Sequence, residues 1–578
     1  MPAASWLARG SAARDRLILI TLGLVLFGAG LGLRDPWPAD EPLHALIARG
    51  MLASGDWLIP TVGGDFFQDK PPLVFWLQAI CFAVTGSERI GFLLPSLLAG
   101  LGTLLLVHDL GRRLWNREAG LGAALLLMFT VQFTLQARRG QLDELLVFFT
   151  TLSVYCLMRQ LLLGGGWRWA IGAGLAAGAG ALTKVVGFFS YFILLPWLIA
   201  LWRGWPGVRW QRPVFMWLAS GLSCVVVVAA WLLPIWLRSR HDAAVAAYLH
   251  ELLITHTVGR YVDPWHHYQP AWYYLQVIAT LWLPLALLLP WLLPRWRDAL
   301  RQRDARMLLP LGFVVLYLAF FTLTRGKRDI YILGALPMLS LAAGPVLADV
   351  LARRGVQRLL AAFVAVVGVA CLGLAAWLAW IDPAGGEALL SSGNVASLWP
   401  LVVLGSVALI APVIAGRGRA HLAVAAMLGS GWLIAGWWVF PQMDAVRSAR
   451  TFIVRLEQMA DPTRELGLLA YHEHFLWQLR RETTNFGHRR FREQEDEMHD
   501  AAAWLAARPG RQLLVPERLL EPCFGAAAAV REVGDSSRGL WYLVEGMPRA
   551  DCSAAGDAGR AIRYMPPGKT GWIPQDRQ

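Results

Sequence analysis

An acidic pair, Asp40-Glu41, follows the first long apolar run of the sequence and directly precedes Pro42. A carboxylate in this place can take a proton from an attacking hydroxyl or amine, if a cation nearby holds the leaving group. The same pair can instead begin a helix, because aspartate caps helix N-termini and proline is tolerated in the first turn. The residues alone leave both interpretations open: a general base at Asp40 or Glu41, or a helix cap.

Lysine is rare in this chain and lies mostly in loops beside apolar runs. Among 53 Lys and Arg residues only four are lysines, and three of them lie in loops next to apolar runs. Guanidinium and ammonium groups in such loops suit a phosphate at a membrane surface. The predicted phosphate-binding residues are Lys70, Arg138, Arg139, Lys327, Arg328 and Tyr331. The alternative is that these loop cations contact anionic lipid headgroups or pair with Asp143, Glu144 and Asp329.

The composition shows what must position these loops. Hydrophobic residues make up 56% of 578 positions, charged residues only 16%, and there are 29 tryptophans, which is typical of a polytopic α-helical membrane protein. The net charge of +13 is scattered through short loops without a basic-aromatic patch, so a nucleic-acid partner is excluded. Apolar runs of spanning length predict about thirteen transmembrane helices, near 16–34, 89–110, 118–136, 143–162, 168–184, 187–203, 213–236, 273–294, 307–324, 329–351, 357–380, 399–416 and 420–440.

Arginines orient these spans. They follow every even-numbered span and also precede the first one, so those faces and the N-terminus are predicted to be cytoplasmic. The loops near 35–88 and 237–272 are then periplasmic, together with the acidic pair and the three loop lysines. The apolar segment 71–84 is short, and counting it as a span would put the basic loops outside. We therefore expect it to lie flat on the membrane.

The polar region from residue 441 to 578 contrasts with the apolar part before it. Acidic helix-like and apolar strand-like runs predict a small α/β domain on the periplasmic side, after a transmembrane catalytic domain over 1–440. Cys523 and Cys552 lie in this region and could form a disulfide in the oxidising periplasm.

Several motifs, taken in order, resemble the GT-C glycosyltransferases. They are Asp40-Glu41 after the first span, ASGDWLIP, DKPPL, RRGQLDELLVFF and KRDIYILGALP, within residues 16–345. Within that family the similarity is to the branch that holds the lipid A aminoarabinose transferase and the protein O-mannosyltransferases. Thirteen spans followed by a small periplasmic domain also resemble the aminoarabinose transferase architecture.

The resemblance implies an inverting transfer of a sugar from an undecaprenyl-phosphate carrier, on the periplasmic side of the bacterial inner membrane. Asp40 would match the family's base and Asp143 its partner near the substrates, while the loop cations would hold the carrier phosphate. The favoured case is 4-amino-4-deoxy-L-arabinose moved to lipid A, which is linked to polymyxin resistance. The alternative is another lipid-linked sugar moved to a protein hydroxyl or an envelope glycan.

Two departures from the family pattern concern the substrate. The usual Asp-Glu-x-Arg-Tyr is Asp40-Glu41-Pro42-Leu43-His44 here, and the usual Glu-Lys-Pro-Pro is Asp69-Lys70-Pro71-Pro72. They leave the sugar and the acceptor open.

The resemblance also suggests a zinc ion, which members of this family can hold with an acidic residue before the lysine and a histidine from a later loop. Here these would be Asp69 and His256, with His250, His266 and His267 as competitors. Two ligands make an incomplete zinc site, so the resemblance leaves open a metal-independent or a zinc-assisted transfer.

A function of a different class is a lipid transporter or flippase, with the charged loops as gates. Transport paths keep ionisable groups near the middle of the membrane. The charges of this chain gather at one membrane face instead, which favours the transferase.

Overall fold

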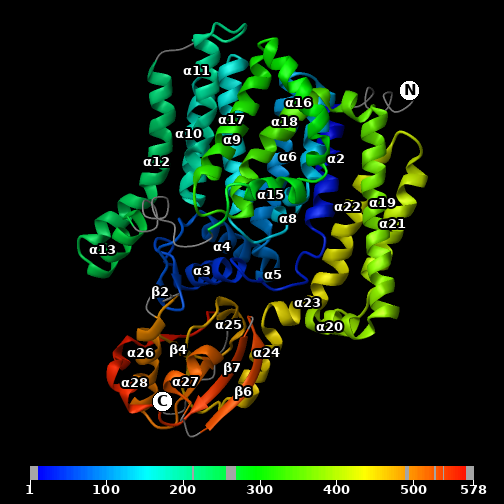
Figure 1. Ribbon diagram of the computed structural model, residues 1–578. Helices are drawn as coiled ribbons and strands as arrows, with labels where there is room; N and C mark the ends of the chain where they lie inside the picture. Colours follow the sequence, from blue (N-terminus) through cyan, green and yellow to red (C-terminus); the bar gives the residue numbers. More distant parts are fainter. Residues whose placement is uncertain are drawn as a thin grey trace.

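The computed structural model describes residues 11–210, 214–254, 268–488, 494–525, 529–537 and 539–567. A large helical bundle stands on a thin layer of short elements, and a small α/β domain lies below that layer (Figure 1). The helices of the bundle, with α13 and α20 at its margin, are α2 (Ala12–Phe27), α6 (Leu94–Leu114), α7 (Arg117–Met128), α8 (Val131–Ala137), α9 (Asp143–Leu162), α10 (Trp167–Thr183), η1 (Val185–Ile193), α11 (Leu194–Trp202), α12 (Val214–Ser239), α13 (Ala243–His250), α15 (Tyr273–Leu281), α16 (Leu285–Arg301), α17 (Ala305–Leu323), η3 (Asp329–Ala335), α18 (Leu336–Leu351), α19 (Arg354–Ala376), η4 (Trp377–Ile381), α20 (Pro383–Gly393), α21 (Trp399–Ala415), α22 (Ala420–Ile434), η5 (Ala435–Val439) and α23 (Phe440–Arg447).

The chain is a multi-pass membrane protein. Among the described residues, eight helices are long and apolar enough to cross a membrane, and two bent helix pairs raise the number to ten. Each of the thirteen predicted ranges coincides with a helix or a helix pair. The polytopic helical fold is thus confirmed, while the number of thirteen spans stays a prediction.

Two ranges predicted as continuous spans are broken helices. α7 and α8 meet at a bend of 72°, and α15 and α16 at a bend of 107°. The second break contains Pro284, which lacks the N–H that would continue the helix. Polar groups at the two breaks form hydrogen bonds with each other. Val131 N donates to Leu283 O at 2.9 Å, and Trp282 Nε1 donates to Gln132 Oε1 at 2.7 Å. Irregular backbone inside a bundle requires such internal partners.

The layer below the bundle consists of α3 (Glu41–Ser54), the hairpin β1 (Thr61–Val62) and β2 (Asp65–Phe66), α4 (Leu73–Thr85) and α5 (Glu88–Gly91). The segment predicted to lie flat is α4, which packs against α3 in this layer (Figure 1). Gly63 and Gly64 both have positive φ, which the two-residue turn of the hairpin requires.

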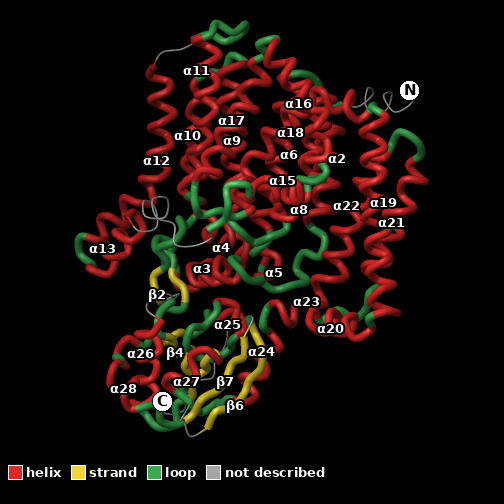
Figure 2. The backbone as a smooth tube through the Cα atoms, viewed as in Figure 1, coloured by secondary structure: helices red, strands yellow, loops and turns green. Residues whose placement is uncertain are grey.

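The C-terminal domain holds a six-stranded sheet of order β6-β7-β5-β3-β4-β8, drawn as strands in Figure 2. β3 is parallel to β4 and β5, and the remaining pairs are antiparallel. Its elements are α24 (Arg450–Met459), β3 (Leu466–Leu468), α25 (Glu473–Gln478), β4 (Thr483–Asn485), α26 (Gln494–Ala507), β5 (Gln512–Pro516), η6 (Glu517–Leu519), α27 (Leu520–Cys523), β6 (Ala529–Ser536), β7 (Gly539–Glu545), α28 (Ala550–Ala555), η7 (Ala558–Arg560) and β8 (Ile562–Tyr564).

One hydrophobic core joins this domain to the layer above it. Leu43, Leu46 and Phe75 of the layer belong to the same buried cluster as Phe475 and Leu543 of the C-terminal domain. α3 is therefore apolar toward the domain below as well as toward its neighbours, and ten of its residues are buried. This packing fixes the helix that carries the acidic pair.

Cys523 and Cys552 form a disulfide across 29 residues, which links α27 to α28. By the entropy of the loop it closes, such a bond stabilises a fold by about 3–4 kcal/mol. We expect the double variant Cys523→Ser/Cys552→Ser to lower the thermal unfolding midpoint of the C-terminal domain, followed by near-ultraviolet circular dichroism. Cys81→Ser, which changes a free cysteine in α4, is the control. Equal midpoints for both variants would contradict a stabilising role for the bond.

Candidate active site

Asp40 lies at the start of α3, yet its side chain makes no capping hydrogen bond. The carboxylate faces two cations instead: Oδ1 lies 3.2 Å from Lys70 Nζ, and Oδ2 lies 3.3 Å from Arg328 Nη2. Asp40 is only 7% exposed, so it is nearly removed from bulk water. Of the two interpretations of Asp40, the structure excludes the helix cap and places the carboxylate in a charged cluster.

Lys70 and Arg328 reach Asp40 from opposite parts of the chain. Lys70 lies just before α4, where Pro71 and Pro72 end the preceding loop, and Arg328 directly precedes η3. Lys70 also donates to His44 Nε2 at 3.2 Å, and His44 Nδ1 lies 3.3 Å from the Gly140 carbonyl oxygen. The fully buried imidazole is thus part of the cluster, although the sequence interpretation gave it no role.

Lys327, the neighbour of Arg328, contacts backbone carbonyl groups and not Asp40. Its Nζ donates to the carbonyl oxygens of Thr324 at 2.5 Å and Gln269 at 3.2 Å, and the residue is 5% exposed. It holds its own turn together. Of the two adjacent cations, the structure brings only Arg328 to Asp40.

A second acidic group lies beside the first. Asp143 begins α9, and its Oδ1 lies 3.0 Å from Lys184 Nζ. That ammonium also lies 4.6 Å from the centre of the Tyr331 ring. The alternative interpretation of the loop cations, that they pair with Asp143, is therefore correct for Lys184. Asp143 also acts electrostatically on His44 and Arg328, which places both acidic groups in one cluster.

Glu41 is held by four donors. Arg34 forms two hydrogen bonds to its carboxylate at 2.5 and 2.8 Å, and the backbone N–H groups of Trp37 and Gly140 each donate at 2.9 Å. With 3% exposure and all these partners, Glu41 fixes the start of α3 against the α8–α9 loop. Its geometry is that of a structural ion pair, whereas Asp40 is the carboxylate of the pair that faces Lys70 and Arg328.

The two arginines of the α8–α9 loop also differ. Arg138 donates to the carbonyl oxygens of Leu26 at 2.5 Å and Ala29 at 2.9 Å, which closes the end of α2. Arg138 is 7% exposed, and a phosphate contact by it stays a prediction. Arg139 is partly exposed and makes no side-chain hydrogen bond or ion pair with the described part of the chain. A phosphate contact by Arg139 stays a prediction.

The cluster fixes the charge of its members. Burial alone would raise the pKa of the Asp40 carboxyl, but the Lys70 ammonium and the Arg328 guanidinium outweigh it and hold the pKa well below 3.8. Burial, and then the Lys70 ammonium, lower the pKa of His44 from 6.5 to about 4. At neutral pH the site therefore contains an ionised aspartate and an uncharged imidazole. Asp40, Asp143, Lys70, Lys184 and Arg328 together leave one positive charge for an anionic ligand.

Comparison with known proteins identifies the architecture. Residues 69–233 match the family model described as dolichyl-phosphate-mannose-protein mannosyltransferase. The crystal structure of ArnT from Cupriavidus metallidurans bound to undecaprenyl phosphate superposes with a TM-score of 0.72 at 19% sequence identity, covering 92% of this chain and 98% of that one. The chain has the GT-C fold.

Part of this chain is similar to curated transferases whose names include undecaprenyl phosphate. The undecaprenyl phosphate-alpha-4-amino-4-deoxy-L-arabinose arabinosyl transferase 2 of Pseudomonas fluorescens is 34% identical over 347 residues, which cover 58% of this chain and 56% of the relative. The corresponding transferase of Pseudomonas aeruginosa is 33% identical over 340 residues, covering 57% and 59%. The matched stretch is less than two thirds of either relative's length. The predicted resemblance to the lipid A aminoarabinose transferases is confirmed.

Three residues of the site were not predicted as site residues from the sequence. His44 and Lys184 join the cluster, and Arg34 holds Glu41, but none of the three carries a motif of its own. Lys184 offered one signal, because it is one of the three lysines in loops next to apolar runs. His44 offered another, because it stands where the family pattern has tyrosine.

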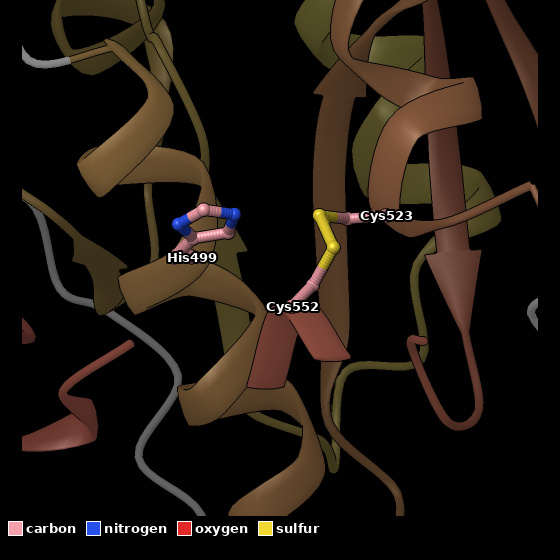
Figure 3. Close-up of side chains that lie close together, drawn as sticks. All are labelled: His499, Cys523 and Cys552. Carbon is pink, nitrogen blue, oxygen red and sulfur yellow. A yellow bond between two sulfur atoms is a disulfide. The ribbon is translucent and has the colours of Figure 1, made fainter. Parts of the chain in front are cut away.

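The zinc prediction cannot be followed in full, because His256, His266 and His267 lie outside the described residues. Asp69 is described, and the pairing of Asp69 with His256 stays a prediction. Within the described ranges, the one group of three potential ligands comprises His499, Cys523 and Cys552 (Figure 3). Its two cysteines are joined in the disulfide, so they offer no thiolate to a metal.

We expect mild acid to destabilise the protein through two buried histidines. Burial lowers the pKa of His474 to about 3 and that of His44 to about 4, from 6.5 in both cases. These imidazoles stay neutral in the folded state while the unfolded chain takes up protons, so their stability contribution is present above pH 6.5 and is lost toward pH 4. The loss at pH 5 is about 2 kcal/mol for each histidine.

The measurement is the thermal unfolding midpoint in detergent at neutral and mildly acid pH. The double variant His44→Gln/His474→Gln should show a smaller drop than the wild type. The exposed His241→Gln serves as control and should drop like the wild type. An unchanged drop in the double variant would show that other groups carry the pH dependence.

Proposed function

We propose that this protein transfers a sugar from an undecaprenyl-phosphate carrier to an envelope acceptor. The favoured pair is 4-amino-4-deoxy-L-arabinose as the sugar and lipid A as the acceptor. The observation that carries the proposal is the buried cluster in which Asp40 lies between Lys70 and Arg328. The GT-C fold and the names of the Pseudomonas relatives support the substrate class.

The cluster suits a reaction in which phosphate leaves. A sugar linked through a phosphodiester carries one negative charge, and its departing phosphate gains a second as the bond to the sugar breaks. Lys70 and Arg328 can stabilise this added charge by hydrogen bonds that strengthen in the transition state. No acid is needed to protonate such a leaving group.

Asp40 can serve as the base of the same step. While it pairs with both cations, its low pKa makes it a weak base. A bound phosphate competes for Lys70 and Arg328, which raises the basicity of Asp40 when substrate is present. The carboxylate can then take the proton from the acceptor hydroxyl as that oxygen attacks the sugar carbon. Asp143, held by Lys184, would orient the sugar or the acceptor beside it.

We place this reaction on the periplasmic side of the inner membrane, with the N-terminus in the cytoplasm. Two observations support this orientation. The arginine-rich loops lie on the opposite side of the predicted spans from Asp40. The C-terminal domain, which shares a core with α3, contains a disulfide, and disulfides persist in the periplasm.

A different sugar is the second candidate, because His44 departs from the family pattern inside the cluster itself. The deciding experiment incubates purified protein with a panel of undecaprenyl-phosphate sugars and with lipid A, and follows the modified acceptor by mass spectrometry. We expect turnover by the wild type and its loss in Lys70→Ala. No turnover with any polyprenyl donor would overturn the proposal. Turnover of another sugar, with unchanged polymyxin sensitivity of a deletion strain, would select the second candidate.

The adjacent cations Arg328 and Lys327 provide a matched pair of variants. Arg328→Gln should raise the KM for the polyprenyl donor about 10- to 100-fold, because it removes a charged hydrogen-bond donor from the phosphate site. Lys327→Met should lower the thermal midpoint and leave the KM within about threefold of the wild type, since this ammonium binds backbone carbonyls. Steady-state kinetics and thermal unfolding measure the two effects. A raised KM in Lys327→Met with an unchanged KM in Arg328→Gln would contradict the geometry.

A further inference from the structure

His44 has a defined partner on each ring nitrogen. The residue lies on α3 one turn after Asp40 and is fully buried. Its Nδ1 lies 3.3 Å from the carbonyl oxygen of Gly140, and its Nε2 lies 3.2 Å from Lys70 Nζ. The rings of His44 and Phe75 lie 5.6 Å apart, so the imidazole also has an apolar neighbour.

These partners determine the tautomer. A carbonyl oxygen only accepts hydrogen bonds, so Nδ1 carries the hydrogen and donates it to Gly140. An ammonium group only donates, so Nε2 accepts from Lys70. The imidazole is therefore neutral with its hydrogen on Nδ1, which agrees with its complete burial beside a cation.

The number of N–H donors on Lys70 determines how many are left for a ligand. An ammonium group has three N–H donors on a flexible chain. In this structure Asp40 Oδ1 and His44 Nε2 each accept one of them. Among the residues that the structure describes, Lys70 has no third acceptor, so one N–H remains, directed by the two bonds already made.

We propose that His44 is a positioning residue, which orients the Lys70 ammonium so that its remaining N–H meets an oxygen of the carrier phosphate. This inference rests on the proposed function, because it needs a phosphate at Lys70. His44 itself touches neither the phosphate nor the sugar. It acts through Lys70, with Gly140 fixing the ring and Asp40 holding the second N–H.

Two substitutions separate this role from plain packing. In His44→Gln, the side-chain amide reaches the place of Nε2, so it can still accept from Lys70 but loses Gly140. In His44→Asn, the amide reaches the place of Nδ1, so it can still donate to Gly140 but loses Lys70. Both variants remove the ring, and a residue that only packs would be affected similarly by the two.

The experiment measures the Kd for undecaprenyl phosphate, without turnover, together with KM and kcat for the sugar donor. We expect His44→Asn to raise Kd and KM about 10-fold or more, the effect of one hydrogen bond to a charged group, with a smaller change in kcat. His44→Gln should stay within about threefold of the wild type. Equal effects of the two variants would overturn the inference.

A double-mutant cycle supplies the second measurement. If His44 acts through Lys70, His44→Asn should not raise Kd further in a Lys70→Ala background. Additive losses would overturn the inference and indicate a general packing role. Failure of the wild type to bind undecaprenyl phosphate would overturn the proposed function and this inference together. Binding by the wild type that His44→Asn leaves unchanged would overturn the inference alone.

Discussion

Asp40→Asn is expected to lower the rate of sugar transfer by about 10²- to 10⁴-fold, the range for loss of a general base. Asparagine has nearly the same shape as aspartate but cannot accept the proton of the acceptor hydroxyl. The effect should appear in kcat, because a general base acts in the chemical step.

The same variant should bind undecaprenyl phosphate at least as tightly as the wild type does. In the wild type, Asp40 competes with phosphate for both cations, and asparagine carries no charge to compete. Lys70→Ala should do the opposite and weaken binding. The two variants together thus distinguish a base from a phosphate ligand.

Transfer assays with purified protein and a binding assay with undecaprenyl phosphate measure both effects. Asp56→Asn is the matched control, because it changes an exposed carboxylate in the loop after α3 that pairs with Arg238. Full transfer activity in Asp40→Asn would remove Asp40 from the chemistry. Equal losses in both variants would show that the substitution acts on the loop as a whole.

Arg34→Met is expected to have the largest effect on stability. It leaves the Glu41 carboxylate buried at 3% exposure without its guanidinium partner, although two backbone donors remain. Breaking a buried ion pair in this way costs about 3–5 kcal/mol. Since the total stability of a domain is about 5–15 kcal/mol, we expect a clear fall in the unfolding midpoint.

Restoring neutrality should recover part of this loss. The double variant Arg34→Met/Glu41→Gln has no uncompensated charge, so its midpoint should lie between those of Arg34→Met and the wild type. Glu41→Gln alone should reduce stability but retain transfer activity in the folded fraction. Loss of activity in folded Glu41→Gln protein would instead make Glu41 part of the chemistry, as its place beside Asp40 first suggested.

Much of the architecture was predictable from local patterns. Long apolar runs indicate helices in a membrane, because a helix satisfies its backbone hydrogen bonds within one continuous segment. The polar composition after position 441, with its acidic helix-like and apolar strand-like runs, predicted the α/β domain, and the strand-like runs at 513–515 and 541–544 lie in β5 and β7. The breaks at Thr130 and Pro284 were not predicted, because each depends on hydrogen bonds to the other.

The sequence by itself determined the membrane class, the acidic pair at Asp40-Glu41 and the unusual loop lysines, since these follow from composition and spacing. Only the tertiary structure decided which groups work together. Arg328 reaches Asp40 across 288 residues, whereas its neighbour Lys327 turns to backbone carbonyls. Local sequence describes both as cations in one loop. The direction of each side chain depends on how η3 packs against α9, α17 and α18, which no local pattern contains.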